Sequence, residues 1–196
     1  MNRKKIISRA VILLMVLCLT PVLRGTAKTQ TLKEASFCTV VIPQGYRSGS
    51  EPGLFISEHN PLDASNITYT VTEVQDETQE MTNAEKVAGQ SEIKADTQSS
   101  QILTKDTFQR QMKESSKNAY GEDAAYKVTA FTDITIDSYP GYRIEGICQI
   151  GSQEIQQTVY LIMASNKTFT ITYSQAPDDG HEEDFAQSQA SIAVHS

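Results

Sequence analysis

Apolar and polar side chains alternate along three consecutive stretches near the end of the chain, as they do in antiparallel β-strands with one buried face. Short polar segments separate the stretches, which predicts a three-stranded meander. The second stretch ends in residues 159–163 (VYLIM), which are apolar on both faces and therefore indicate a central strand. The three predicted strands are Tyr142–Ile150, Glu154–Ala164 and Thr168–Ser174.

Four earlier stretches have a similar β-like pattern. Ser36–Ile42, Leu54–Ser57 and Asn66–Val74 predict an N-terminal β unit. Ala125–Ile136 predicts a strand that leads into the meander. The segment that follows it, residues 137–141 (DSYPG), predicts a turn because Asp, Ser, Pro and Gly favour turn conformations.

Helical patterns fill the remaining segments. Thr82 and Glu85 have the spacing of a capping box, which predicts a helix through residue 91. Asp106 is predicted to cap a second helix that ends at Gly121, with one side formed by Phe108, Met112, Ser115 and Ala119. A last helix is predicted from about His181 to Ala193. The order of elements indicates an α+β fold, in which helices pack on the faces of an antiparallel sheet.

The segment Met1–Ala27 has the organisation of a secretory signal peptide. Basic residues are followed by an apolar run at positions 10–19, and Gly25-Thr26-Ala27 offers small residues where a signal peptidase cuts. The run is shorter than the ~20 residues that cross a bilayer, although an uncleaved anchor remains the alternative. We therefore predict a signal peptide (1–27), a polar lead-in (28–35) and one domain (36–196) that is secreted or extracytoplasmic, with no stable membrane span after cleavage.

Loss of this segment changes the charge of the chain. Met1–Ala27 holds five of the 17 basic residues and none of the 24 acidic ones, so the remainder has a formal net charge of −12. Such an acidic surface repels nucleic acid and anionic lipid, which makes both poor partners.

Four short segments resemble the PsbP/Mog/DcrB superfamily. They are residues 38–46 (CTVVIPQGY), 139–146 (YPGYRIEG), 159–161 (VYL) and 170–174 (TITYS). The resemblance implies an α/β/α sandwich, an antiparallel sheet with helices on both faces. It implies no single activity, because members include an oxygen-evolving-complex subunit, a Ran-binding protein and bacterial envelope proteins. The kind of member that this chain resembles is a bacterial exported PsbP-like protein.

The sequence offers little for catalysis. Its three histidines, His59, His181 and His195, have no metal-ligand spacing, and there is no G-x-S-x-G motif for a nucleophilic serine. The acidic residues between 178 and 184 lie at the N-terminus of a predicted helix, where carboxylates interact favourably with the helix dipole. We therefore predict no catalytic residues, no metal and no cofactor.

Three residues are candidates for binding. Tyr139, Tyr142 and Arg143 surround the predicted Pro140-Gly141 turn, which could present two rings and a guanidinium group to a partner. In the alternative interpretation, which the sequence favours, the tyrosines cover the end of the sheet and Arg143 points to water.

Two cysteines remain after signal cleavage, Cys38 and Cys148, and both take inward-facing positions of predicted strands. A disulfide between them would persist in an exported protein if the Cα atoms lay within ~7 Å. Two buried thiols are the favoured alternative. The triplets that begin at Asn66 and Asn166 match the N-glycosylation pattern, but we interpret both as incidental.

These patterns together predict an exported, non-enzymatic binding or assembly module with an unknown protein or envelope partner. The alternative is a secreted hydrolase whose site forms only in three dimensions. A pocket that joins two carboxylates, or His59 beside a hydroxyl or thiol, would favour the hydrolase. An exposed aromatic patch around Tyr139 and Tyr142 would favour the module.

Overall fold

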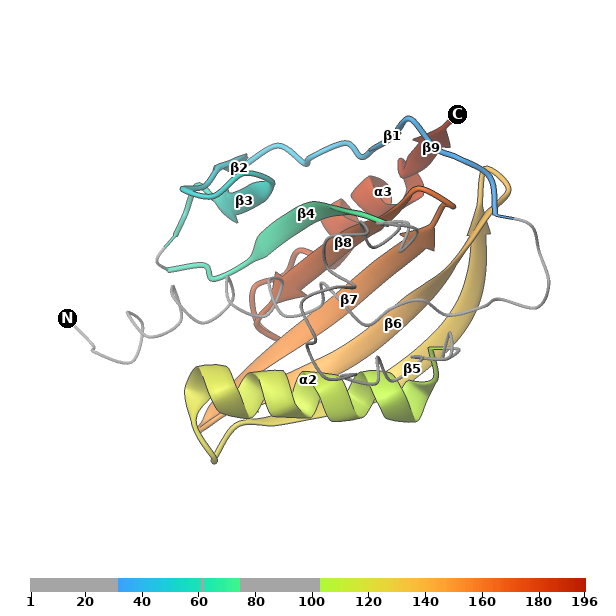
Figure 1. The fold of residues 1–196 in the computed structure, drawn as a ribbon. Coiled ribbons are helices and arrows are strands. Elements are labelled where there is room, and N and C mark those ends of the chain that lie inside the picture. Colours follow the sequence, from blue (N-terminus) through green and yellow to red (C-terminus); the bar gives the residue numbers. More distant parts are fainter. Residues whose placement is uncertain (1–31, 61, 75–102) are drawn as a thin grey trace, which may run out of the picture.

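The computed structural model describes residues 32–60, 62–74 and 103–196 (Figure 1). The predicted signal peptide and the helix predicted at residues 82–91 lie outside these ranges. The described elements, in chain order, are β1 (Phe37–Thr39), β2 (Tyr46–Ser48), β3 (Leu54–Ser57), β4 (Asn66–Glu73), α2 (Lys105–Tyr120), β5 (Ala125–Ile136), β6 (Tyr139–Ile150), β7 (Gln153–Met163), β8 (Lys167–Gln175), α3 (Glu182–Ala190) and β9 (Ala193–His195).

Seven strands form one antiparallel sheet in the order β2-β3-β4-β8-β7-β6-β5. This arrangement confirms the α+β fold class and the predicted meander. Strand β7 lies between β6 and β8, and its residues Leu161 and Ile162 point to opposite faces with no exposed surface. Apolar residues on both faces therefore did indicate a central strand.

The two faces of the sheet carry separate hydrophobic cores. On one face, Phe108 and Met112 of α2 pack against Ile144, Val159 and Leu161, and we call this the α2 face. On the other, the α3 face, Phe185 of α3 packs with residues of β4, β7 and β8, together with β1 and β9. Successive strand residues alternate between these faces, so the strands supply side chains to both cores.

Helix α2 begins slightly earlier than the sequence pattern predicts. Thr104 is its N-cap and forms a capping box with Thr107, so Asp106 lies within the first turn and is not the cap. A threonine hydroxyl at N3 takes the place of the usual Glu or Gln, which explains why the motif was missed. The helix ends before Gly121 as predicted, and Ser116 rather than Ser115 faces the core.

The C-terminal segment differs from the prediction. Helix α3 ends at Ala190, and the chain then forms strand β9 instead of continuing as a helix to Ala193. Strand β9 pairs with β1, so β1 belongs to a separate two-stranded sheet and not to an N-terminal β unit with β3 and β4. Strands as short as β1 and β9 carry too little pattern to reveal this long-range pairing.

The turn between β5 and β6 consists of Asp137 and Ser138 alone. Both have positive φ angles, 49° and 74°, as a two-residue type I′ hairpin requires. Tyr139, Pro140 and Gly141 already belong to β6 and pair with the end of β5. The predicted turn over residues 137–141 is therefore too long, because its Pro-Gly pair lies within a strand.

Candidate functional site

The three predicted binding residues do not form a shared surface. Tyr139 and Tyr142 are 4% and 5% exposed and belong to the cores on opposite faces of the sheet. The Tyr139 hydroxyl donates to the backbone oxygen of Glu34 at 2.6 Å. The Tyr142 ring packs against Phe131, with 5.0 Å between ring centroids. Neither ring is available to a partner.

Arg143 is half-buried and interacts with neighbouring side chains of the sheet. Its Nε donates to the hydroxyl of Tyr160 at 3.1 Å, and an Nη atom pairs with Glu145 at 2.5 Å. The guanidinium carbon also lies 6.0 Å from the centroid of the Tyr160 ring. Arg143 thus neither points freely to water nor joins Tyr142 in an exposed patch.

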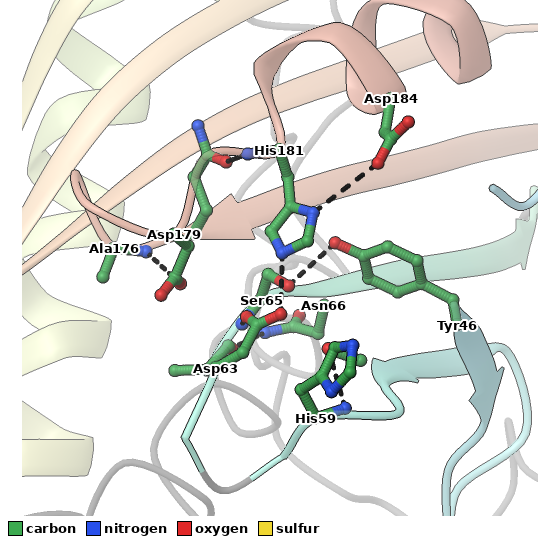
Figure 2. Close-up of polar contacts among 12 residues, drawn as sticks. Tyr46, His59, Asp63, Ser65, Asn66, Ala176, Asp179, His181 and Asp184 are labelled. Carbon is green, nitrogen blue, oxygen red and sulfur yellow. Dashed lines mark hydrogen bonds and ion pairs between the residues drawn. The ribbon is translucent and has the colours of Figure 1, made fainter. Parts of the chain in front are cut away.

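A cluster of polar side chains forms instead where the loop between β3 and β4 meets the start of α3. His181 precedes α3, and its Nε2 lies 2.6 Å from a carboxylate oxygen of Asp63. Its Nδ1 lies 3.7 Å from the carboxylate of Asp184, one turn into the helix. Figure 2 shows the imidazole between the two acids, with Tyr46 beside it. The Asp63 and His181 side chains are mostly buried.

Hydroxyl groups and backbone amides hold the Asp63 side of this cluster. The amide of Ser65 donates to Asp63 at 2.8 Å, and the Tyr46 hydroxyl donates to the Ser65 hydroxyl at 2.8 Å. Burial raises the pKa of Asp63, but hydrogen bonds from Ser57, Ser65 and His181 outweigh burial and lower the pKa to about 2. Asp63 is therefore a fixed anion at neutral pH.

The His181 side is held by the loop before α3 and by aromatic rings. The backbone amide of His181 donates to the side-chain oxygen of Gln175 at 3.2 Å, and the amide of Ala176 donates to Asp179 at 2.8 Å. The imidazole contacts the rings of Tyr46 and Phe185, with centroids 5.6 and 5.9 Å away. Burial and the nearby acids Asp63 and Asp178 raise the pKa of Asp179.

This geometry clamps two segments together and does not assemble a nucleophile. Both ring nitrogens of His181 face carboxylates, and no hydroxyl or thiol of the described residues lies at either. His59 meets the Ser57 hydroxyl through its backbone amide, so its contact does not activate that serine. Within residues 32–60, 62–74 and 103–196, no group of three or more His, Cys, Asp or Glu side chains could hold a metal ion.

The pattern of residues along the chain does not predict this cluster. Asp63 and His181 are 118 residues apart, and each lies in a segment without periodic pattern. The run of acids after His181 was the visible signal, and we interpreted it as a helix N-terminus. Nothing in the sequence marked Asp63 as its partner.

The two cysteines lie in different cores. Cys38 belongs to the core on the α3 face and Cys148 to the core on the α2 face, and both are free thiols. Burial, with a contribution from Asp137 for Cys38, raises the pKa of each thiol to about 11. The structure therefore does not place Cys38 and Cys148 close enough for a disulfide.

Both glycosylation triplets have structural explanations. Asn66 is buried in β4, so its amide is not accessible in the folded chain. The amide of Asn166 forms two 3.0 Å hydrogen bonds with Ala35, one to the backbone oxygen and one from the backbone nitrogen. The side-chain amide of Asn166 thus binds both backbone groups of Ala35, in the way that the backbone of a neighbouring β-strand would.

The chain resembles known proteins in structure but not in sequence. No protein-family model matches the chain, and no curated protein matches it. The cyanobacterial PsbP protein CyanoP from Synechocystis sp. PCC 6803 matches 87% of this chain and 96% of its own, with a TM-score of 0.54 and 14% sequence identity. The fold is PsbP-like.

A second solved structure has a weaker likeness. LpqN of Mycobacterium tuberculosis, which is involved in cell envelope biogenesis, matches 83% of this chain and 86% of its own, with 8% identity and a TM-score of 0.47. At such low identities the PsbP likeness establishes the fold and no activity. Among the helices of the described ranges, none is long and apolar enough to cross a membrane.

Proposed function

We propose that this protein is an exported, non-enzymatic binding or assembly module of the cell envelope. Export is supported by the basic start, apolar run and small residues of positions 1–27. A non-enzymatic role is supported by the clamp between Asp63 and His181, in which carboxylates occupy both ring nitrogens of the histidine. The PsbP-like fold is consistent with such a module but selects no partner.

The observation that carries the proposal is a pair of exposed apolar side chains on the segment around β1. Phe37 is 51% exposed and Val41 is 64% exposed, whereas Cys38, Val40 and Ile42 point into the core on the α3 face. The alternation turns Phe37, Thr39 and Val41 outward together. We call these three residues the β1 outer row.

Hydrogen bonds to α3 and to the C-terminal segment hold this row in place. The amide of Val41 donates to the Ser191 hydroxyl at 2.8 Å, and its carbonyl accepts from the Ser188 hydroxyl at 2.6 Å. The Phe37 ring stacks on His195 of β9, with 4.5 Å between centroids. A partner therefore meets apolar side chains that are already ordered, which lowers the entropic cost of association.

The expected partner has a small apolar surface with basic residues around it. Apolar contact would cover Phe37 and Val41, and the net charge of −12 on the chain after Ala27 would attract a basic rim at long range. Such a partner is a protein, or another component of the envelope with the same chemistry.

Retention of an envelope component by the immobilised chain (residues 28–196) tests this proposal. The double variant Phe37→Ser/Val41→Ser should lose a component that the unchanged protein retains from a solubilised envelope fraction of the producing organism. Leu62→Ser is the matched control, because Leu62 is even more exposed, at 78%, but lies in the loop before β4. Equal retention by all three proteins would contradict a role for the β1 outer row.

A hydrolase would be revealed by a different result. Turnover of a p-nitrophenyl ester by the purified chain, abolished in His181→Ala, would establish catalysis and overturn the non-enzymatic proposal. We expect no such turnover, because a histidine between two carboxylates has no hydroxyl or thiol to activate.

A further inference from the structure

The main sheet ends on one side in a long strand. In the described sheet, β5 has 12 residues and pairs with β6 alone, whereas the opposite edge strand, β2, has three residues. Figure 1 shows β5 as the outermost strand on its side, next to α2. Natural proteins usually shorten, cover or interrupt edge strands, because the unpaired backbone groups of an edge bind other extended chains. The length of β5 therefore requires an explanation.

Helix α2 protects the first half of this edge. The side-chain oxygen of Gln109 in α2 accepts a hydrogen bond from the backbone amide of Val128 at 3.1 Å. The strand register then shifts between Val128 and Ala130, which is a β-bulge. After the bulge, β5 continues from Ala130 to Ile136. We call the side of this segment that faces away from β6 the open edge.

Alternate residues of the segment turn their backbone groups outward. The two-residue turn between β5 and β6 closes with the hydrogen-bonded pair Ile136 and Tyr139. Because hydrogen-bonded and non-hydrogen-bonded pairs alternate in an antiparallel ladder, the N–H and C=O groups of Phe131, Asp133 and Thr135 point away from β6. Of the residues that the structure describes, none hydrogen-bonds these outward groups. Each of the three residues therefore offers one donor and one acceptor to an incoming strand.

Apolar side chains line both faces of the open edge. Phe131 packs with the core on the α2 face, and Ile134 and Ile136 pack with the core on the α3 face. All three are only partly buried, and β5 has a neighbouring strand on one side alone. A strand added at this edge would cover them further, which is favourable because it removes apolar area from water.

The charge of the edge restricts the occupant. Asp133 is exposed near the centre of the segment and forms no salt bridge with any residue of the described ranges. Arg143, which lies opposite Thr132, pairs with Glu145 instead. A second copy of the chain is disfavoured, because each copy has a net charge of −12 after Ala27. A basic residue opposite Asp133 would form a favourable cross-strand pair.

We propose that the open edge binds an extended segment of a partner protein by antiparallel strand addition. This segment has a lysine or arginine opposite Asp133 and apolar residues opposite Ile134 and Ile136. In such recognition, backbone hydrogen bonds supply affinity and alternate side chains supply specificity. The inference goes beyond the proposed function, because it adds a second contact site that does not include the β1 outer row.

Two N-methylated forms of the peptide acetyl-VTVKVTV-amide test the proposal by nuclear magnetic resonance of the isotope-labelled chain (residues 28–196). When the peptide lysine lies opposite Asp133, the lysine and both threonines turn their backbone groups toward β5, whereas the third and fifth residues turn theirs to water. The form that is N-methylated at the third and fifth residues should shift the amide signals of Phe131, Asp133 and Thr135 in a saturable way at millimolar concentration. The form that is N-methylated at both threonines should bind roughly tenfold more weakly or not at all, because two donors are lost.

Hydrogen exchange gives a readout that is specific to strand addition. With the first peptide, amide exchange should slow at Phe131, Asp133 and Thr135, because these amides gain partners. The amides of Thr132 and Ile134 bond to β6 and should be protected with or without peptide. Equal binding of the two methylated forms, no saturable shift with either, or slowed exchange without this alternation would overturn the proposal.

Charge reversal tests the role of Asp133. The variant Asp133→Lys should weaken binding of the lysine peptide roughly tenfold and should favour a peptide with glutamate in place of the lysine. Glu114→Lys, which changes the charge of an exposed residue of α2 by the same amount, is the matched control and should preserve the affinity. Equal affinities in the two variants would contradict the assigned occupant.

A second copy of the chain is the competing occupant. In the free protein, the amides of Phe131, Asp133 and Thr135 should exchange rapidly at every protein concentration. Exchange that slows at these three amides as the concentration rises would show self-pairing of β5 and overturn the proposal.

The open edge and the β1 outer row fail separately. Peptide binding should survive in Phe37→Ser/Val41→Ser. If the peptide binds but the retention of an envelope component does not depend on Phe37 and Val41, the β1 outer row is wrong and the open edge stands. If retention depends on Phe37 and Val41 but neither methylated peptide binds, the open edge is wrong and the β1 outer row stands.

Discussion

Single side chains in this protein join segments that lie far apart in the sequence. Asn166 pairs with the backbone of Ala35, and a carboxylate oxygen of Asp137 accepts from the amide of Val194 at 2.9 Å. Asp63 pairs with His181. Each contact joins a segment that packs on the α3 face to a loop of the main sheet. These residues should therefore contribute more to the free energy of unfolding than their neighbours.

Asn166→Ala should destabilise the fold by about 1–3 kcal/mol, because it leaves two backbone groups of Ala35 without partners. Urea unfolding gives the free-energy difference. Asn118→Ala, at a position of α2 outside the hydrophobic core, is the control and should change stability by less than about 0.5 kcal/mol. An equal loss in both variants would contradict the role of Asn166.

Protonation of Asp63 should destabilise the folded protein at low pH. Its pKa falls from an ordinary 3.8 to about 2 in the folded chain, so its contribution to stability is complete above pH 3.8 and is lost as the pH falls toward 2. The corresponding free energy is about 2 kcal/mol. Asp63→Asn should flatten the stability curve between these pH values, as urea unfolding at a series of pH values would measure.

The control for this prediction is Asp106→Asn, which changes an exposed aspartate in the first turn of α2. It should preserve the acid dependence of the unchanged protein. If Asp63→Asn preserved the same dependence, the hydrogen bonds of the clamp would not be the cause of acid sensitivity.

At the level of elements, the sequence predicted what depends on local periodicity. Strands β5 to β8 were predictable because their residues alternate between two faces of the sheet over nine or more positions. The β1–β9 pair was not, because strands this short show no period and the partners lie at opposite ends of the described chain. The contact between Asp63 and His181 was not predictable either, because it depends on how two loops without periodic pattern meet in space.

The turn between β5 and β6 shows how a local signal can mislead. Pro140-Gly141 is a typical turn pair, but Asp137 and Ser138 adopt the positive φ angles that a type I′ hairpin needs. Pro140 is the second residue of β6 and lies before the residues that pair with β7, which begin at Gly141.

Ser138→Gly should stabilise the protein by about 0.5–1 kcal/mol. A side chain at φ 74° is strained, and glycine removes this strain at a smaller cost in unfolded-state entropy. Thermal unfolding should show a higher Tm for Ser138→Gly and a lower one for Ser138→Val. The opposite order would mean that the turn does not adopt this conformation.

At the level of the whole molecule, one sheet separates two hydrophobic cores. Helix α2 covers one face, and α3 with β1 and β9 covers the other (Figure 1). Cys38 and Cys148 are on opposite sides of this partition. Stability therefore comes from burial on both faces, without a covalent link between them.

Thiol titration should detect two reactive thiols per chain in unfolded, non-reduced protein that begins at Lys28. In the folded protein both should react slowly, because burial raises each pKa to about 11 and encloses the sulfur. An absence of reactive thiols after unfolding would show that Cys38 and Cys148 are oxidised.

The β1 outer row lies on the side of the molecule covered by α3, β1 and β9, so the proposed module has its partner surface on that side. The clamp between Asp63 and His181 joins the loop before β4 to the start of α3 and so stabilises the side that presents Phe37. The central claim is that this side contacts an envelope component after export.

Photocrosslinking in living cells of the producing organism tests that claim most directly. A photoreactive phenylalanine analogue replaces Phe37 in one variant and Leu62 in another, both in the full chain. We expect a defined adduct with an extracytoplasmic component from position 37 and none from position 62. An adduct from position 37 with cytoplasmic proteins only, equal adducts from both positions, or no adduct from either would contradict it.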